Sequence, residues 1–110
     1  MLKPISFLGS AASDLRAVSR NVRRRLGFDL HRLQAGEEPM DWRPMGDIGP
    51  GVGELRARDE TGAYRAFYVA KFPEAIYVLH CFEKKTQKTA QLDIELGRKR
   101  YKALIEARKP

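Results

Sequence analysis

Basic side chains recur at the ends of several short β-prone segments. Arg56 and Arg58 alternate with apolar residues, so they would lie about 6.6 Å apart on one face of a strand. The turn signal Asp59–Gly62 then brings the chain back, and further basic side chains follow: Arg65, Lys84, Lys85 and Lys88. Guanidinium and ammonium groups gathered in this way can hold a phosphodiester and stabilise negative charge that develops on phosphorus. The pattern predicts a phosphate-binding patch.

A second interpretation of the same residues stays open. The face on which Arg65 projects depends on the type of turn before it, which the sequence does not fix. Charged side chains along a sheet edge also protect a protein from aggregation through that edge. The basic residues are therefore either a binding patch or a solvated edge.

Groups that transfer protons are scarce near these cations. His80 lies inside an apolar run, with Val78 and Phe82 expected on the same strand face. This setting favours a hydrogen-bonded core histidine, although His80 is also the only natural acid or base close to the cluster. We keep His80 and Lys88 as candidate substrate-binding residues.

Carboxylates that could support metal chemistry are not grouped. Glu37–Glu38 and Asp59–Glu60 fall in predicted loops or turns, and neither pair has the spacing of a two-metal site. No phosphate-binding glycine loop or Ser/His/Asp order occurs either. We therefore expect neither a metal ion nor a cofactor.

The composition is that of an ordinary globular domain. The chain has 110 residues, of which 43% are apolar and 32% charged, and it is too short for two domains, so we expect one domain over residues 1–110. The single cysteine, Cys81, excludes an internal disulfide and predicts an inert buried thiol. Apolar runs are short and the first residues lack a signal core, so we expect a cytoplasmic location without a membrane span.

Charge is unevenly distributed along the chain, whose formal net charge is +7. Residues 84–110 carry 9 basic and 3 acidic side chains, and residues 16–32 carry six arginines against one aspartate. Residues 37–60, in contrast, hold seven acids and three arginines. Such a field suits a polyanionic partner, although solubility or an acidic protein partner also accounts for it.

The first half of the chain predicts a strand followed by helix. Residues 5–8 are β-prone. An apolar stripe at three- and four-residue steps then predicts either one amphipathic helix over residues 14–35 or two helices with a break at Gly27. Residues 37–53 hold three prolines and four glycines, which predicts a connecting loop.

The second half predicts three strands and a helix. Strand candidates occupy residues 54–59, 64–72 and 76–82, joined by tight turns that make neighbours antiparallel. Glu54 is expected on the exposed face with Arg56 and Arg58, and the apolar last strand should be central. A helical pattern covers residues 90–107 and places Tyr101 inward. The prediction is an α+β domain: a small curled, mainly antiparallel sheet of about four strands, packed against an N-terminal helix or helical hairpin, with a C-terminal helix.

Several short strings point to one known family. They are Ile5–Ser10 opening into a helix with Asp14–Leu15, Trp42–Met45 followed by Gly49–Val52, Glu54–Arg56 with Tyr64–Arg65, and Val78–Phe82 with Lys84–Thr89. With these strings nearly the whole chain resembles the RelE/ParE superfamily of bacterial toxins, and specifically its phage-related HigB-like branch. The last string is the most specific of the set.

The resemblance implies a toxin encoded beside a small antitoxin, which is often a helix-turn-helix protein of the HigA type. It implies contact with DNA only through the complex of the two proteins. Free toxins of this kind cut mRNA in the ribosomal decoding site, where the ribose 2′-hydroxyl attacks the adjacent phosphate without a metal ion. ParE-like members instead inhibit DNA gyrase without nuclease activity, and this stays the alternative function.

Matched by position, the resemblance assigns catalytic roles to Arg56 or Arg58, to Arg65, and to Lys84 or Lys85. Many ribosome-dependent members also carry an aromatic residue or a histidine near the C-terminus that stacks on a base or transfers a proton. This chain departs from that pattern, because its only late aromatic is the inward-facing Tyr101. A lysine whose pKa is lowered by cationic neighbours is then a candidate for proton transfer.

Overall fold

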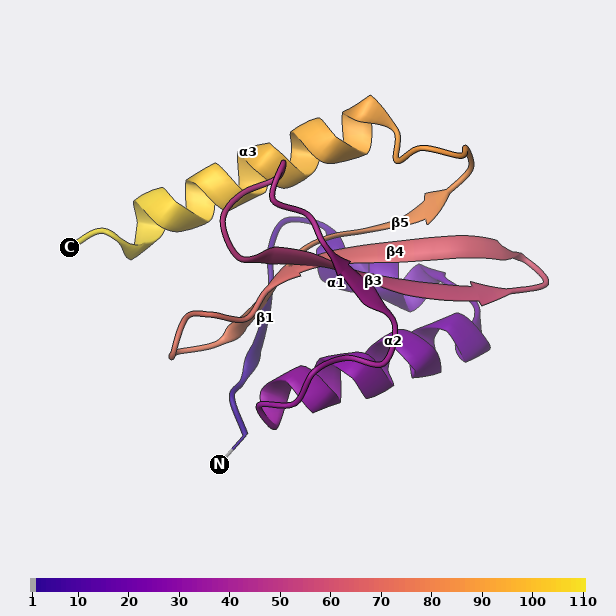
Figure 1. Cartoon of the computed structure of the whole chain (residues 1–110), viewed down its shortest axis with the longest axis horizontal. Helices are drawn as coiled ribbons and strands as arrows, with labels where there is room; N and C mark the ends of the chain where they lie inside the picture. The colour runs from indigo at the N-terminus through magenta and orange to yellow at the C-terminus, as the bar shows by residue number, and fades with distance from the viewer. Residues whose placement is uncertain (1) are drawn as a thin grey trace.

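Three layers make up the computed structural model of this protein, which describes residues 2–110. In chain order the elements are β1 (Ile5–Phe7), α1 (Ala11–Ala17), α2 (Arg20–Gln34), β2 (Trp42–Pro44), β3 (Val52–Asp59), β4 (Gly62–Val69), β5 (Ile76–Lys84) and α3 (Gln91–Arg108). The strands form one sheet with α1 and α2 on one face and α3 on the other (Figure 1).

The strand order is β1-β5-β4-β3-β2. β1 runs parallel to β5, and every other neighbouring pair is antiparallel. The α+β class and the mainly antiparallel sheet are thus confirmed, and β5 is a central strand as its apolar sequence predicts. The sheet has five strands where about four were expected.

The additional strand is β2, which lies inside the segment predicted as a loop. Trp42, Arg43 and Pro44 pair with the start of β3 at the edge of the sheet, a position where the missing N–H of a proline does no harm. The prediction of loop was wrong here because a strand of three residues carries no periodic signal of its own.

The N-terminal helical stretch is two helices, but the break does not lie at Gly27. It lies at Val18 and Ser19, where the Ser19 hydroxyl accepts a hydrogen bond of 3.3 Å from the backbone N–H of Val22. Gly27 sits in the middle of α2. A serine hydroxyl that accepts a hydrogen bond from a free backbone N–H favours the start of a helix. A single glycine inside a helix destabilises it only slightly, so α2 continues through Gly27.

Both faces of the sheet are covered by apolar side chains. On one face the stripe of α2, with Val22, Leu26 and Leu30, packs in one cluster with Leu55 and other strand residues. On the other face Tyr101 and Leu104 of α3 join a second cluster built on β4 and β5. No helix among the described residues is long and apolar enough to span a bilayer.

An irregularity in β5 decides which of its side chains face α3. Phe67 is opposite His80, but the next residue, Tyr68, is opposite Val78, so Leu79 is an extra residue in the strand. Such a bulge reverses the alternation of side chains beyond it. Val78 therefore packs on the α2 side, and the expectation that it shares a face with His80 was wrong.

Two glycines with different surroundings test this packing. Gly27 is exposed and has open space where a Cβ would stand, so we expect Gly27→Ala to raise the free energy of unfolding by about 1 kcal/mol. A Cβ at Gly97 would lie 2.9 Å from the buried ring of Phe67, so Gly97→Ala should lower the free energy of unfolding. Urea unfolding followed by circular dichroism measures both, and a stabilising Gly97→Ala would contradict the packing of α3.

Candidate functional site

The hairpin between β3 and β4 determines where the arginines point. Arg56 lies opposite Arg65, and Arg58 lies opposite Ala63. Ala63 in turn lies opposite Lys84 of β5. Because residues directly opposite one another in an antiparallel pair project to the same face, Arg56, Arg58, Arg65 and Lys84 share one face of the sheet.

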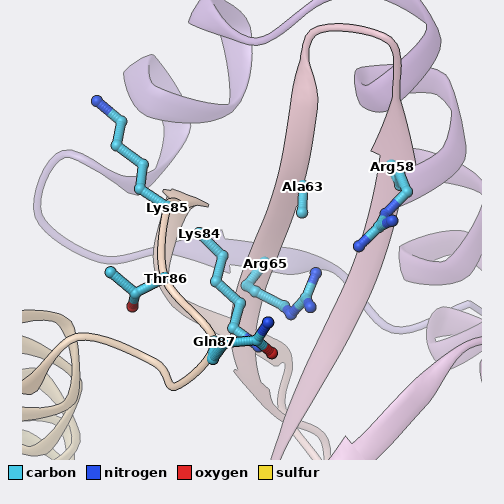
Figure 2. A pocket seen from close by; sticks show the side chains of 7 residues that line it. All are labelled: Arg58, Ala63, Arg65, Lys84, Lys85, Thr86 and Gln87. Atoms are coloured by element: carbon cyan, nitrogen blue, oxygen red, sulfur yellow. The ribbon is translucent and has the colours of Figure 1, made fainter.

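The basic hollow is the cavity of about 480 Å³ at this end of the sheet, lined by Arg58, Ala63, Arg65, Lys84, Lys85, Thr86 and Gln87. Figure 2 shows Arg58, Arg65 and Lys84 approaching the hollow from three neighbouring strands, whereas the amino group of Lys85 points away from them. The expected convergence of cations is therefore present for these three side chains, and Lys85 stands at the edge.

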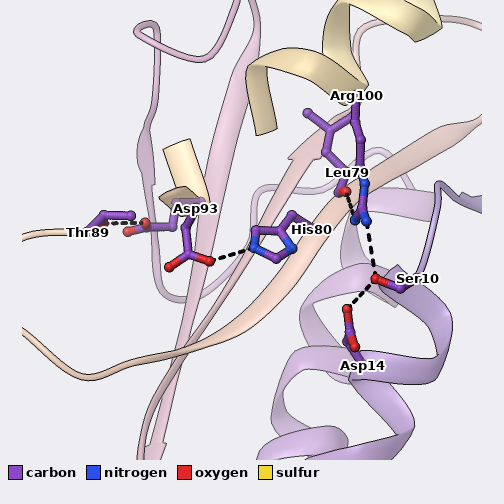
Figure 3. A network of polar contacts seen from close by, with 8 residues as sticks. Ser10, Asp14, Leu79, His80, Thr89, Asp93 and Arg100 are labelled. Atoms are coloured by element: carbon purple, nitrogen blue, oxygen red, sulfur yellow. Dashed lines mark hydrogen bonds and ion pairs between the residues drawn. The ribbon is translucent and has the colours of Figure 1, made fainter. Parts of the chain in front are cut away.

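The other candidate residues lie around the basic hollow. Arg56 lines an adjoining hollow of about 230 Å³ together with Arg58 and Arg65. Lys88 is exposed and lines a third hollow beyond Gln87. His80 is buried, and its Nε2 lies 2.7 Å from a carboxylate oxygen of Asp93 at the start of α3 (Figure 3).

Arg65 is held in place by a buried carboxylate. The side chain of Glu54 is fully buried, and its Oε1 lies 3.4 Å from Nε of Arg65 and 3.0 Å from Nε of Arg43. Its other oxygen accepts a hydrogen bond of 3.4 Å from the Thr89 hydroxyl. Glu54 thus connects β2, β3, β4 and the segment that follows β5.

This arrangement leaves one part of the Arg65 guanidinium group free. Nη1 donates to the carbonyl oxygen of Tyr64 at 3.0 Å, whereas buried Nε lies 3.4 Å from Glu54 as an ion pair and makes no hydrogen bond among the described residues. Nη2 has no hydrogen-bond partner among the described residues and belongs to a side chain that lines the basic hollow. Burial lowers the pKa of Arg65 and Glu54 opposes that effect, and an arginine remains charged under such conditions. A charged donor thus stays available in the hollow.

Lys84 has an altered proton affinity. Partial burial lowers the pKa of its ammonium group below 10.5, and the positive charges of Arg65 and Arg43 lower it further, against the opposing effect of Glu54. Both causes disfavour the charged form. A larger fraction of Lys84 is therefore neutral near neutral pH than of an isolated lysine.

Glu54 and Arg43 were not recognised as part of the site from the sequence. Glu54 was expected on the exposed face of its strand, and this was wrong: it is fully buried beneath the two arginines that it pairs with. The only sequence signal that linked Glu54 to the site was its alternation with Arg56 along the strand. The pairing of Arg43 with Glu54 across β2 and β3 could not be seen because β2 itself was not predicted.

Other chemically suggestive residues serve the interior. Cys81 is buried, and burial together with Asp14 raises its pKa to about 12 despite Arg100 nearby. Tyr101 faces inward as predicted and donates a hydrogen bond of 3.0 Å to the carbonyl oxygen of Pro50. Within residues 2–110, no three His, Cys, Asp or Glu side chains come together as a metal-binding group.

Comparison with known proteins places this architecture. A solved structure of the Escherichia coli toxin RelE, a double arginine-to-alanine mutant in the free state, is similar, with a TM-score of 0.58 and 16% sequence identity over 99% of this chain and 100% of that chain. The protein therefore has the RelE-like α+β fold. Residues 13–102 match the family described as phage derived protein Gp49-like (DUF891), and the chain belongs to that family. No curated protein matches the sequence.

The buried position of Glu54 predicts unequal effects of removing its partners. Glu54→Ala leaves Arg65, whose side chain is 6% exposed, without its counter-charge, which should lower the free energy of unfolding by about 3–5 kcal/mol. The side chain of Arg43 is 45% exposed, so Arg43→Ala should cost about 1 kcal/mol or less. Chemical denaturation of the two variants measures the difference, and equal losses would show that Glu54 does not hold Arg65 as described.

Proposed function

We propose that this protein is the toxin of a type II toxin–antitoxin system and a ribosome-dependent mRNA endonuclease. The observation that carries the proposal is the convergence of Arg58, Arg65 and Lys84 on one hollow. Fixed cationic donors of this kind hold a phosphodiester and stabilise the charge of its transition state. The RelE-like fold and the resemblance of the local strings support the same function.

In the proposed reaction, Arg65 and Arg58 bind the non-bridging oxygens of the scissile phosphate. Neutral Lys84 accepts the proton of the ribose 2′-hydroxyl as that oxygen attacks phosphorus. The bond from phosphorus to the 5′-oxygen of the next nucleotide breaks, and that oxygen takes a proton from solvent. The products are a 2′,3′-cyclic phosphate and a 5′-hydroxyl, and no metal ion or cofactor takes part.

The proposed partners follow from this function. They are the ribosome with its mRNA, and a cognate antitoxin, proposed to be a helix-turn-helix protein of the HigA type through which alone the pair contacts DNA. A cytoplasmic location belongs to the same proposal. Lys85, Lys88 and Arg56, which surround the basic hollow, would extend the contact along the RNA backbone.

Substitutions in the hollow test the catalytic assignment. We expect Arg58→Ala and Lys84→Ala each to slow mRNA cleavage on a reconstituted ribosome about a hundredfold, because each removes a preorganised cationic group. Lys102→Ala, which removes an exposed lysine of α3 outside the hollow, is the matched control and should cleave normally. These two sites are preferable to Arg65, because truncating Arg65 also disturbs buried Glu54.

Mapping of mRNA ends after brief induction in cells decides between the two functions of the superfamily. Cuts inside translated codons are expected for the nuclease. Intact transcripts together with broken chromosomal DNA would reject the nuclease in favour of gyrase inhibition, and wild-type cleavage by both hollow variants would reject the assigned site.

The lowered pKa of Lys84 predicts a pH dependence. Because a general base must be neutral, the rate of cleavage should rise with pH above about pH 6 and level off above the pKa of Lys84, which is lowered from 10.5. Lys84→Arg keeps the charge but titrates too high to act as a base, so its residual rate should lack this rise. Single-turnover rates across the range provide the measurement, and a flat wild-type profile would argue against proton transfer by Lys84.

A further inference from the structure

The third hollow, beyond Gln87, is a cavity of about 470 Å³ that we call the polar pocket. Two stretches of chain line it, residues 43–47 and residues 87–94, and its walls include Arg43, Met45, Asp47, Gln87, Lys88 and Ile94. Its volume falls within the range of about 300–1,000 Å³ that is usual for sites that bind small molecules. The polar pocket is therefore large enough to receive the base of a nucleotide.

The polar pocket adjoins the basic hollow. Gln87 lines both cavities. Buried Glu54 also connects them, because its carboxylate lies 3.4 Å from Nε of Arg65, which lines the basic hollow, and 3.0 Å from Nε of Arg43, which lines the polar pocket. An RNA strand whose scissile phosphate lies in the basic hollow would therefore have the base of a neighbouring nucleotide beside the polar pocket.

Arg43 presents a fork of hydrogen-bond donors to this pocket. Its Nε donates to Glu54 at 3.0 Å, whereas Nη1 and Nη2 make no hydrogen bond to any of residues 2–110. About half of the side chain is exposed, so an incoming ligand can reach it. A guanidinium group that a carboxylate holds at Nε is oriented in advance and can bind two adjacent acceptors.

Asp47 is the lining residue that phosphate binding does not explain. Its exposed carboxylate makes no hydrogen bond or ion pair within residues 2–110. The backbone is held in place here, because Nε of Arg98 donates to the carbonyl oxygen of Asp47 at 2.8 Å. A carboxylate beside a basic surface repels phosphate groups, but it accepts hydrogen bonds from the N–H groups of a base. Asp47 therefore indicates contact with a base and not with the RNA backbone.

The apolar part of the polar pocket offers a surface for the flat face of a base. Met45 is buried and Ile94 is partly buried, and both belong to the cluster between the sheet and α3. The N–H of Met45 also donates to the carbonyl oxygen of Val52 at 2.9 Å, which fixes this wall to β3. Proteins that bind an unstacked base pack its faces against apolar or aromatic side chains and read its edge with polar groups. The polar pocket combines both kinds of group.

A guanidinium fork together with a carboxylate matches guanine best. Guanine has two adjacent acceptors, O6 and N7, to which one arginine can donate two hydrogen bonds. Its N1–H and N2–H₂ groups are two adjacent donors, and the two oxygens of one carboxylate can accept from both. Adenine has a donor, N6–H₂, beside N7, so it cannot accept both hydrogen bonds of the fork. Cytosine and uracil lack N7, and neither has two adjacent donor groups.

We propose that the polar pocket binds the base next to the scissile phosphate and that Arg43 and Asp47 make it selective for guanine, a proposal that rests on the proposed function. Arg43 donates to O6 and N7 of the base, and Asp47 accepts from N1–H and N2–H₂. Neither residue takes part in breaking or forming bonds at phosphorus. The two side chains therefore determine which codons are cut and not how the phosphate reacts.

Nucleotide binding tests the polar pocket without the ribosome. The purified full chain is titrated with GMP, AMP, CMP and UMP, and amide chemical shifts are followed by NMR. These nucleotides share the same phosphate and ribose, so differences between them report on the base. GMP should bind about tenfold more tightly than the other three and should shift the amide signals of residues 45–48 and 87–91.

Two variants complete the binding test. Asp47→Asn should abolish the preference for GMP, because an amide has one acceptor oxygen where the carboxylate has two. Glu106→Gln is the matched control: it also converts a carboxylate to an amide, at an exposed position near the end of α3. This control should bind all four nucleotides as the wild-type protein does.

Cleavage on a reconstituted ribosome tests the consequence for specificity. mRNAs that differ only in the bases on either side of the cut are compared in single-turnover reactions. The wild-type protein should cut beside guanine about tenfold faster than beside the other bases. Asp47→Asn should lose this advantage and keep the wild-type rates for the other bases. A destabilised variant would slow cleavage of every mRNA equally, so the pattern separates base recognition from a structural role.

Three results bear against the proposal or its basis. Equal binding of the four nucleotides would show that the polar pocket recognises no base, while the nuclease assignment stands. A preference for guanine that persists in Asp47→Asn would show that the ribosome or another surface selects it. Absence of mRNA cleavage by the wild-type protein, together with guanine-selective binding that Asp47→Asn abolishes, would reject the proposed function and not the guanine site.

Discussion

Register between β3 and β4 is the constraint on which the candidate site depends. Arg56 stands opposite Arg65 because a tight turn joins the two strands. A slip by one residue would send Arg65 to the α2 side, where the sheet packs on an apolar helix stripe, and burying an unpaired guanidinium there would be very costly. The hydrophobic packing of one face therefore enforces the collection of positive charge on the other.

Gathering cations at one place has an electrostatic cost, which buried Glu54 offsets. Its carboxylate is within 3.4 Å of Arg65 and within 3.0 Å of Arg43, and it lies beneath the basic surface where it neither reaches solvent nor occupies the hollow. The result is a positive face supported by a negative charge from below. Such an arrangement allows the arginine side chains at the surface to stay charged, oriented and available to an anion.

Periodicity and turn signals predicted the long elements, the antiparallel order and the central position of β5, because each of these leaves a local pattern in the sequence. Three features depend on contacts between distant segments and could not be predicted. β2 exists only through its pairing with β3, the extra residue Leu79 is evident only against β4, and the burial of Glu54 requires both partners. The sequence therefore predicted which cationic side chains belong to the candidate site, but not the contacts between distant segments that hold them in place.

The single parallel pair in the sheet has a consequence for how the chain is made. Among residues 2–110, β1 pairs with β5 alone, and β5 separates it from β4. During synthesis, the first strand has nothing to pair with until residues 76–84 leave the exit tunnel, and pairing across such a long loop is slow. Lys84 arrives with that same segment. A nascent chain consequently lacks a complete cationic surface for most of its translation. The candidate site is formed only when β5 joins the sheet.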